Sequence, residues 1–132
     1  MILIYIVGKF FLYCGMFYLL LKLYQLRPDG EWSFSLSWAS IRMLVGVIFG
    51  LPLLYIQSAL QSQGLSEMGS YVTAFGGLRL IEWGMLFALV AHRHKIRWGG
   101  RAVAWIAGST FASMLSDGLA ILNGADQLRF FC

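Results

Sequence analysis

Four long apolar stretches constrain this chain more than any other feature. They run from about Ile2 to Tyr24, Trp38 to Leu60, Tyr71 to His92 and Ala102 to Leu122. Each has close to the ~20 residues that an α-helix needs to cross the hydrocarbon core of a bilayer. Because lipid offers no hydrogen-bond partners, the backbone of each stretch must be satisfied within a helix. The sequence therefore predicts an all-α integral membrane protein, in which residues 1–132 form one compact bundle of four transmembrane helices.

The composition supports the same class. Of the 132 residues, 59% are hydrophobic and 12% are charged, whereas soluble domains carry about 25% charged residues. The first apolar stretch is longer than a signal-peptide core and lacks a small-residue cleavage site, so we expect it to be retained. Cys14 and Cys132 match no disulfide framework or metal-binding spacing.

The distribution of basic residues predicts the orientation of the helices. Lys22 and Arg27 flank the start of the first connection, and the second connection, Gln61 to Ser70, contains no lysine or arginine. The third connection contains Arg93, Lys95, Arg97 and Arg101. Short loops rich in lysine and arginine stay in the cytoplasm. We therefore expect both termini on the outer side, and the short chain with this charge asymmetry favours a bacterial inner membrane.

The basic residues near the membrane surface are predicted to contact anionic lipid headgroups, at about 1 kcal/mol each. They are Arg42, Arg93, Lys95, Arg97 and Arg101. Arg42 belongs to this group because it lies about one turn inside the predicted cytoplasmic end of the second helix. His92 and His94 have no acid or cysteine near them in the sequence, so we predict no metal site. The basic and aromatic residues lie at the membrane surface, so we predict no nucleic-acid binding.

Four charged residues fall in the predicted outer half of the apolar stretches, where each costs about 2.5–3.5 kcal/mol unless it is compensated. Arg79 and Glu82 lie three residues apart and therefore on one helix face. Measured from the outer boundary at ~1.5 Å per residue, Asp117, Lys9, Arg79 and Glu82 lie at depths of roughly 8, 12, 12 and 16 Å. Two cations and two anions at similar depth predict a buried polar cluster. Two alternatives stay open: Lys9 extends outwards to the headgroups, and Arg79 with Glu82 forms only a structural ion pair.

Small and hydroxyl-bearing residues recur at helical spacing in the second and fourth stretches. Ser109 and Ser113 form a polar stripe that continues to Asp117. The predicted helix-packing positions are Gly46, Gly50, Gly108 and Ala112. Small side chains at a spacing of four allow close approach of another helix, from the same or another chain.

Three functions are compatible with these features. The favoured one is a channel or transporter for a small ion or solute, and four helices enclose so little space that it predicts a homo-oligomer. The second is a non-catalytic accessory or scaffold subunit of a larger membrane complex. The third, less favoured, is an enzyme acting on a lipid-linked substrate, with Glu82 or Asp117 as acid or base and Arg79 or Arg42 binding a phosphate. We assign no catalytic residue and expect no cofactor.

Overall fold

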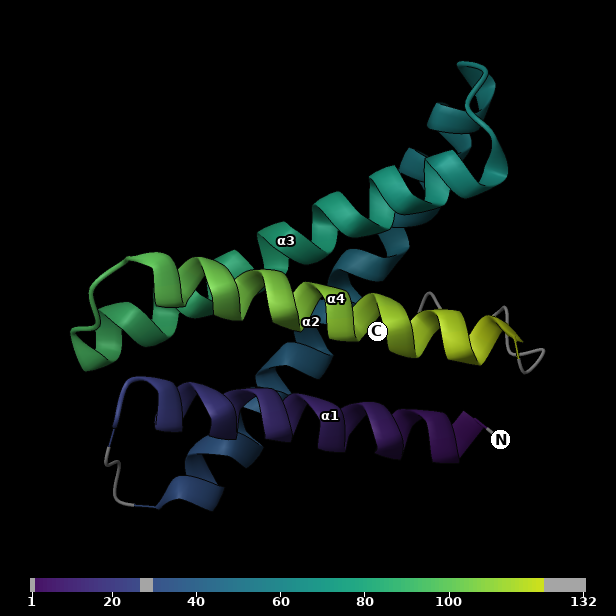
Figure 1. Ribbon diagram of the computed structural model, residues 1–132. Coiled ribbons are helices and arrows are strands. Elements are labelled where there is room, and N and C mark those ends of the chain that lie inside the picture. Colours follow the sequence, from purple (N-terminus) through teal and green to yellow (C-terminus); the bar gives the residue numbers. More distant parts are fainter. Residues whose placement is uncertain (1, 27–29, 123–132) are drawn as a thin grey trace.

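The computed structural model describes residues 2–26 and 30–122, which contain four helices and no β-strand. The helices are α1 (Ile2–Leu23), α2 (Glu31–Ser62), α3 (Glu67–His94) and α4 (Gly100–Leu122). Successive helices run in opposite directions (Figure 1). Each helix packs against the next in the chain, and α4 also packs against α1. The predicted all-α class is therefore confirmed for this part of the chain.

Three of these helices are long and apolar enough to cross a membrane: Leu3–Leu23, Glu31–Ser62 and Gly69–His94. They suggest an integral membrane protein. The fourth helix, α4, has 23 residues. Its buried face carries Ser109, Thr110, Ser113 and Asp117.

The second helix begins at Glu31 rather than at the predicted Trp38. Serine side chains near the start of α2 are compatible with a helix. Ser35 Oγ donates to the backbone oxygen of Glu31 at 3.0 Å, and Ser40 Oγ donates to that of Leu36 at 2.8 Å. Such bonds to the preceding turn satisfy a serine inside a helix. The longer α2 places Arg42 about 16 Å from its start, at ~1.5 Å per residue.

Aromatic rings from all four helices form the centre of the core. The ring centroids of Trp83 in α3 and Trp105 in α4 lie 5.3 Å apart at an interplanar angle of 87°. Phe17 in α1 lies within 5.6 Å of both tryptophans and 6.1 Å from Trp38 in α2. Aromatic pairs in such geometries stabilise a core beyond the area they bury. The second, smaller core cluster consists of Leu53, Ala74 and Phe75, between α2 and α3.

The exposed basic residues in the described part of the chain gather at one end of the bundle. The end of α1, the start of α2 and the α3–α4 connection lie there, and the α2–α3 connection lies at the opposite end (Figure 1). Arg101 Nη1 at the start of α4 donates to the backbone oxygen of Leu23 at the end of α1, at 3.3 Å. We call this the basic end; its exposed basic side chains are Lys22, Arg93, Lys95, Arg97 and Arg101.

The predicted packing positions fall into two environments. Gly46 and Gly50 are buried in α2. Gly108 is exposed, and a Cβ atom built on it would meet nothing within 4 Å. Ala112, one turn further along α4, is half-buried. Close packing at Gly108 would therefore require a helix from another chain.

Candidate functional site

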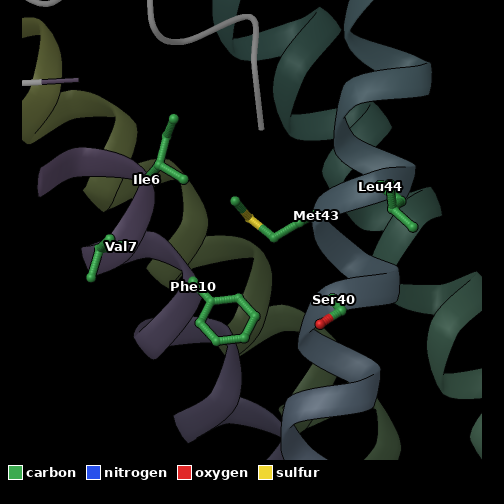
Figure 2. Close-up of a pocket in the computed structure, with 6 residues that line it drawn as sticks. All are labelled: Ile6, Val7, Phe10, Ser40, Met43 and Leu44. Atoms are coloured by element: carbon green, nitrogen blue, oxygen red, sulfur yellow. The ribbon is translucent and has the colours of Figure 1, made fainter. Parts of the chain in front are cut away.

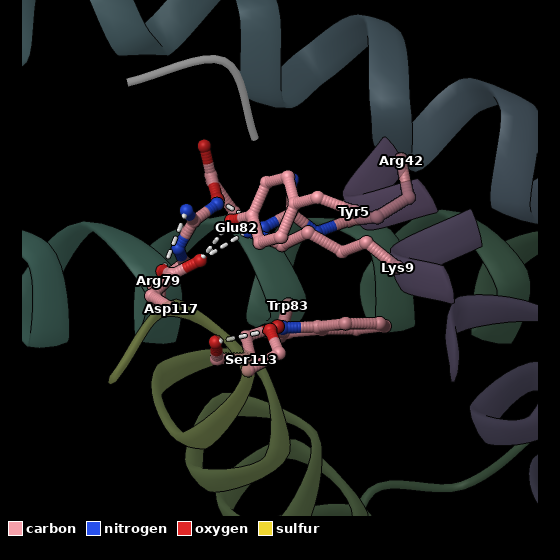
Figure 3. A network of polar contacts seen from close by, with 9 residues as sticks. Tyr5, Lys9, Arg42, Arg79, Glu82, Trp83, Ser113 and Asp117 are labelled. Carbon is pink, nitrogen blue, oxygen red and sulfur yellow. Dashed lines mark hydrogen bonds and ion pairs between the residues drawn. The ribbon is translucent and has the colours of Figure 1, made fainter. Parts of the chain in front are cut away.

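Five charged side chains meet in the interior of the bundle, and we call them the charge cluster: Lys9, Arg42, Arg79, Glu82 and Asp117 (Figure 3). Every one of the four helices contributes at least one of them. At most 2% of any of these side chains is exposed. The structure thus brings together the four residues that we expected to meet, and it adds Arg42.

Asp117 in α4 accepts hydrogen bonds from two other helices. Its Oδ1 accepts from the hydroxyl group of Tyr5 at 2.7 Å and from Lys9 Nζ. Its Oδ2 accepts from Arg79 Nη2 at 3.2 Å. Lys9 Nζ also donates to the hydroxyl oxygen of Tyr5 at 2.8 Å. The alternative that Lys9 extends to the headgroups is wrong, because its side chain is 0% exposed and paired inside the bundle.

Glu82 in α3 forms the second half of the cluster. Its Oε2 accepts from Arg42 Nη2 at 2.6 Å and from Arg79 Nη1 at 3.3 Å. Arg79 therefore contacts both carboxylates and connects the two halves. A guanidinium group presents several donors in one plane, which suits it to bridging two acids. The network links all four helices through their charged side chains.

Arg42 was predicted to contact lipid headgroups, and the structure corrects this prediction. Its side chain is 0% exposed. The guanidinium carbon lies 5.0 Å from the ring centroid of Tyr13 and 5.1 Å from that of Trp83. Both rings attract the cation through their π faces. The earlier start of α2 explains the error, because it moves Arg42 deeper into the bundle than the sequence suggested.

The predicted serine stripe, Ser109 and Ser113, lies beside the charge cluster, and neither hydroxyl group forms a hydrogen bond with a charged side chain among the described residues. Ser113 Oγ accepts a hydrogen bond from Trp83 Nε1 at 3.2 Å, and it thereby fixes the ring that lies against Arg42. Ser109 is also 0% exposed, but its hydroxyl group has no hydrogen-bond partner in the described part of the chain.

The charge cluster is incompletely paired among the residues that the structure describes. The nitrogen atoms without a hydrogen-bond partner are Nε and Nη1 of Arg42 and Nε of Arg79. One oxygen, Oε1 of Glu82, is also without a partner. Buried polar groups are nearly always hydrogen-bonded, so these four atoms call for an explanation. Unused donors outnumber unused acceptors here, which favours a ligand that accepts hydrogen bonds.

The other predicted site residues lie away from the cluster. The side chains of Arg93, Lys95, Arg97 and Arg101 are exposed at the basic end. Across residues 2–26 and 30–122, no group of three or more histidine, cysteine, aspartate or glutamate side chains is placed to hold a metal ion.

An apolar groove lies between α1 and α2 (Figure 2). It is lined by Ile6, Val7, Phe10, Ser40, Met43 and Leu44. The hydroxyl group of Ser40, its one polar side chain, already donates to the backbone oxygen of Leu36. The groove therefore offers no group for chemistry, and the charge cluster is the stronger candidate site.

The chain matches no protein-family model, no curated protein and no solved structure.

Proposed function

We propose that the protein is a four-helix membrane transporter or channel, and that the charge cluster binds the small anion it carries. The observation that supports this proposal is the set of three buried guanidinium N–H positions without a partner, on Arg42 and Arg79. A small anion accepts hydrogen bonds from such positions. It also compensates the described charges, which comprise three cations and two carboxylates.

A purely structural role explains the cluster less well. Buried ion pairs contribute little net stability compared with well-packed apolar residues, and partly paired networks are costly. Charged residues inside a membrane are, by default, candidates for ion and substrate pathways. Two arginines with unused donors therefore fit a site that is completed by its substrate.

The proposed arrangement in the membrane follows from the basic end. In this arrangement α4 crosses the membrane together with α1, α2 and α3. The basic end faces the cytoplasm, as positive residues in short loops do. The start of α1 and the end of α4 then face outwards, and the membrane we propose is a bacterial inner membrane.

The proposal includes a homo-oligomer. One chain of four helices encloses the charge cluster without an open path, since the exposed fraction of each charged side chain is at most 2%. Association through exposed small residues such as Gly108 would supply additional walls for a pathway.

The test is ion flux in liposomes that contain the purified protein. Potassium salts of chloride, nitrate and acetate are placed outside, with a potassium ionophore to balance charge. We expect anion entry at least ten times faster than in empty liposomes, with rates that depend on the anion. Flux equal to that of empty liposomes, or flux that is the same for all three anions, would contradict the proposal.

The second candidate is an accessory subunit of a larger membrane complex. The observation in its favour is the wide apolar surface, on which Leu44, Phe111 and Leu115 are among the large side chains that are more than half exposed. Lipid covers such a surface, and so does a partner helix. Native mass spectrometry of the gently solubilised protein separates the two candidates. A closed homo-oligomer favours transport, and stoichiometric binding of another membrane protein favours the accessory role.

A further inference from the structure

A second polar site lies at the basic end, separate from the charge cluster. It is a groove between the start of α2 and the end of α3, lined by Gly30, Ser33, Phe34, Ser37, Trp38, Arg93 and His94. Its volume is about 380 Å³, within the roughly 300–1,000 Å³ typical of small-molecule sites. The groove lies where two membrane-length segments, Glu31–Ser62 and Gly69–His94, have their ends.

Three polar groups in this groove are hydrogen-bond donors that no residue in the described ranges 2–26 and 30–122 accepts from. Arg93 forms no ion pair or hydrogen bond with any described residue, and neither do the hydroxyl groups of Ser33 and Ser37. This distinguishes the two serines from Ser35 and Ser40, whose hydroxyl groups donate to the backbone of the preceding turn. A guanidinium group and two hydroxyl groups in one groove form a suitable site for an oxyanion.

The backbone at the start of α2 also favours the binding of an oxyanion in this groove. Gly30 precedes the first turn of α2 and lines the groove, and it provides no side-chain cap for the helix. The first N–H groups of a helix have no partner within it, and they carry partial positive charge. The nearest acid in the first turn, Glu31, lies opposite Lys22 at 3.8 Å and does not line the groove.

The apolar part of the groove indicates which kind of molecule bears the anionic group that binds there. Phe34 and Trp38 are each 8% exposed, and their rings pack at a tilt of 52° with centroids 6.1 Å apart. The ring of His94 contacts Phe34 edge-on at 5.3 Å. A free phosphate ion would gain nothing from this aromatic floor, whereas a phospholipid has a glycerol backbone and acyl chains to lay on it. We propose that this groove binds the phosphate headgroup of an anionic phospholipid from the adjacent leaflet.

The test uses two arginine variants that remove the same charge from the same segment. Arg93 lines the groove, and Arg97 is exposed nearby but does not line it. Each variant is placed in nanodiscs of phosphatidylglycerol mixed with phosphatidylcholine, and the lipid retained after release is counted by native mass spectrometry. We expect Arg93→Ala to lower phosphatidylglycerol retention about 5- to 10-fold and Arg97→Ala to lower it less than about 2-fold. The double variant Ser33→Ala/Ser37→Ala should also lower retention, and it leaves the net charge unchanged.

Two results would overturn the proposal. Equal losses of phosphatidylglycerol retention in Arg93→Ala and Arg97→Ala would indicate that the basic end attracts anionic lipid diffusely and has no specific site. Displacement of the lipid by millimolar inorganic phosphate would assign the groove to a free phosphate group. Persistence of phosphatidylglycerol binding in the presence of inorganic phosphate, together with its loss in Arg93→Ala, would support a lipid site.

Discussion

Arg42 Nη2 in α2 donates a 2.6 Å hydrogen bond to Oε2 of Glu82 in α3, and neither side chain is more than 1% exposed. Charge-assisted hydrogen bonds of this length are among the strongest in proteins. The contact joins α2 to the part of the cluster formed by α1, α3 and α4. It places a guanidinium group with two unused nitrogen atoms at the centre of the bundle.

Arg42→Gln should strongly destabilise the protein. The substitution leaves the buried Glu82 carboxylate with Arg79 as its one recorded partner, and loss of one member of a buried ion pair costs about 3–5 kcal/mol. The measurement is the free energy of unfolding in detergent. The control is Lys22→Gln, because the Lys22 side chain is 57% exposed and lies 3.8 Å from Glu31, in a class of pair worth about 0–1 kcal/mol. Equal effects of the two substitutions would contradict the buried pairing.

Asp117→Asn should destabilise the protein more than Lys9→Met. Asp117 accepts hydrogen bonds from Tyr5, Lys9 and Arg79, so its charge stabilises several donors, whereas Lys9→Met leaves the carboxylate with two of them. The double variant should cost less than the sum of the single variants by at least about 1 kcal/mol, as expected for residues in one network. The free energies of unfolding of the wild type, the two single variants and the double variant measure this coupling. Strict additivity would mean that the two side chains do not interact.

Two buried serines one turn apart on α4 should respond differently to alanine. Ser113→Ala removes the acceptor of the Trp83 indole N–H, so it should destabilise the protein by about 1–3 kcal/mol. Ser109→Ala removes a buried hydroxyl group without a recorded partner, so it should be neutral or stabilising. Thermal unfolding of both variants in one detergent provides the comparison. If Ser109→Ala were the more damaging change, the assigned hydrogen bond would be wrong.

The proposed homo-oligomer predicts a position-dependent effect of bulky side chains. Gly108 and Gly8 are both exposed helical glycines with open space around them. Gly108→Leu should shift the protein towards monomer with its helix content unchanged, because a large side chain blocks close helix approach. Gly8→Leu should leave the oligomer intact. Native mass spectrometry measures the oligomeric state, and circular dichroism measures the helix content. An unchanged oligomer in Gly108→Leu would show that the face around Gly108 is not the subunit interface.

The helical class followed from the length of the apolar stretches, which lipid allows only as helices. The contacts among Lys9, Arg79, Glu82 and Asp117 were anticipated from their depth, their balance of charge and the spacing of Arg79 and Glu82. Arg42 was misplaced because Trp32 to Ser37 resemble a polar connection, although the structure makes them helical. The spacing of Arg42, Gly46 and Gly50 contained a usable signal. Residues four apart share a helix face, and a face with two glycines suits burial against another helix.

Other features of the site depend on the packing of distant segments. The ring of Trp83 lies against Arg42 on one helix and donates to Ser113 on another. No local pattern relates these three residues, because their contacts arise only when the helices have a defined rotation and distance. The unused nitrogen atoms of Arg42 and Arg79 likewise became evident only once every hydrogen bond was assigned.

The most direct test of the central claim is anion flux through Arg42→Lys in liposomes, with assembly measured on the same preparation. Lysine keeps the positive charge beside Glu82 but lacks the planar group that carries Nε and Nη1, the two positions without a partner. If the cluster binds the transported anion, flux should fall at least tenfold while the stoichiometry and helix content stay unchanged. An anion flux equal to that of the wild type in a correctly assembled Arg42→Lys variant would contradict the claim. The charge cluster would then have a structural role.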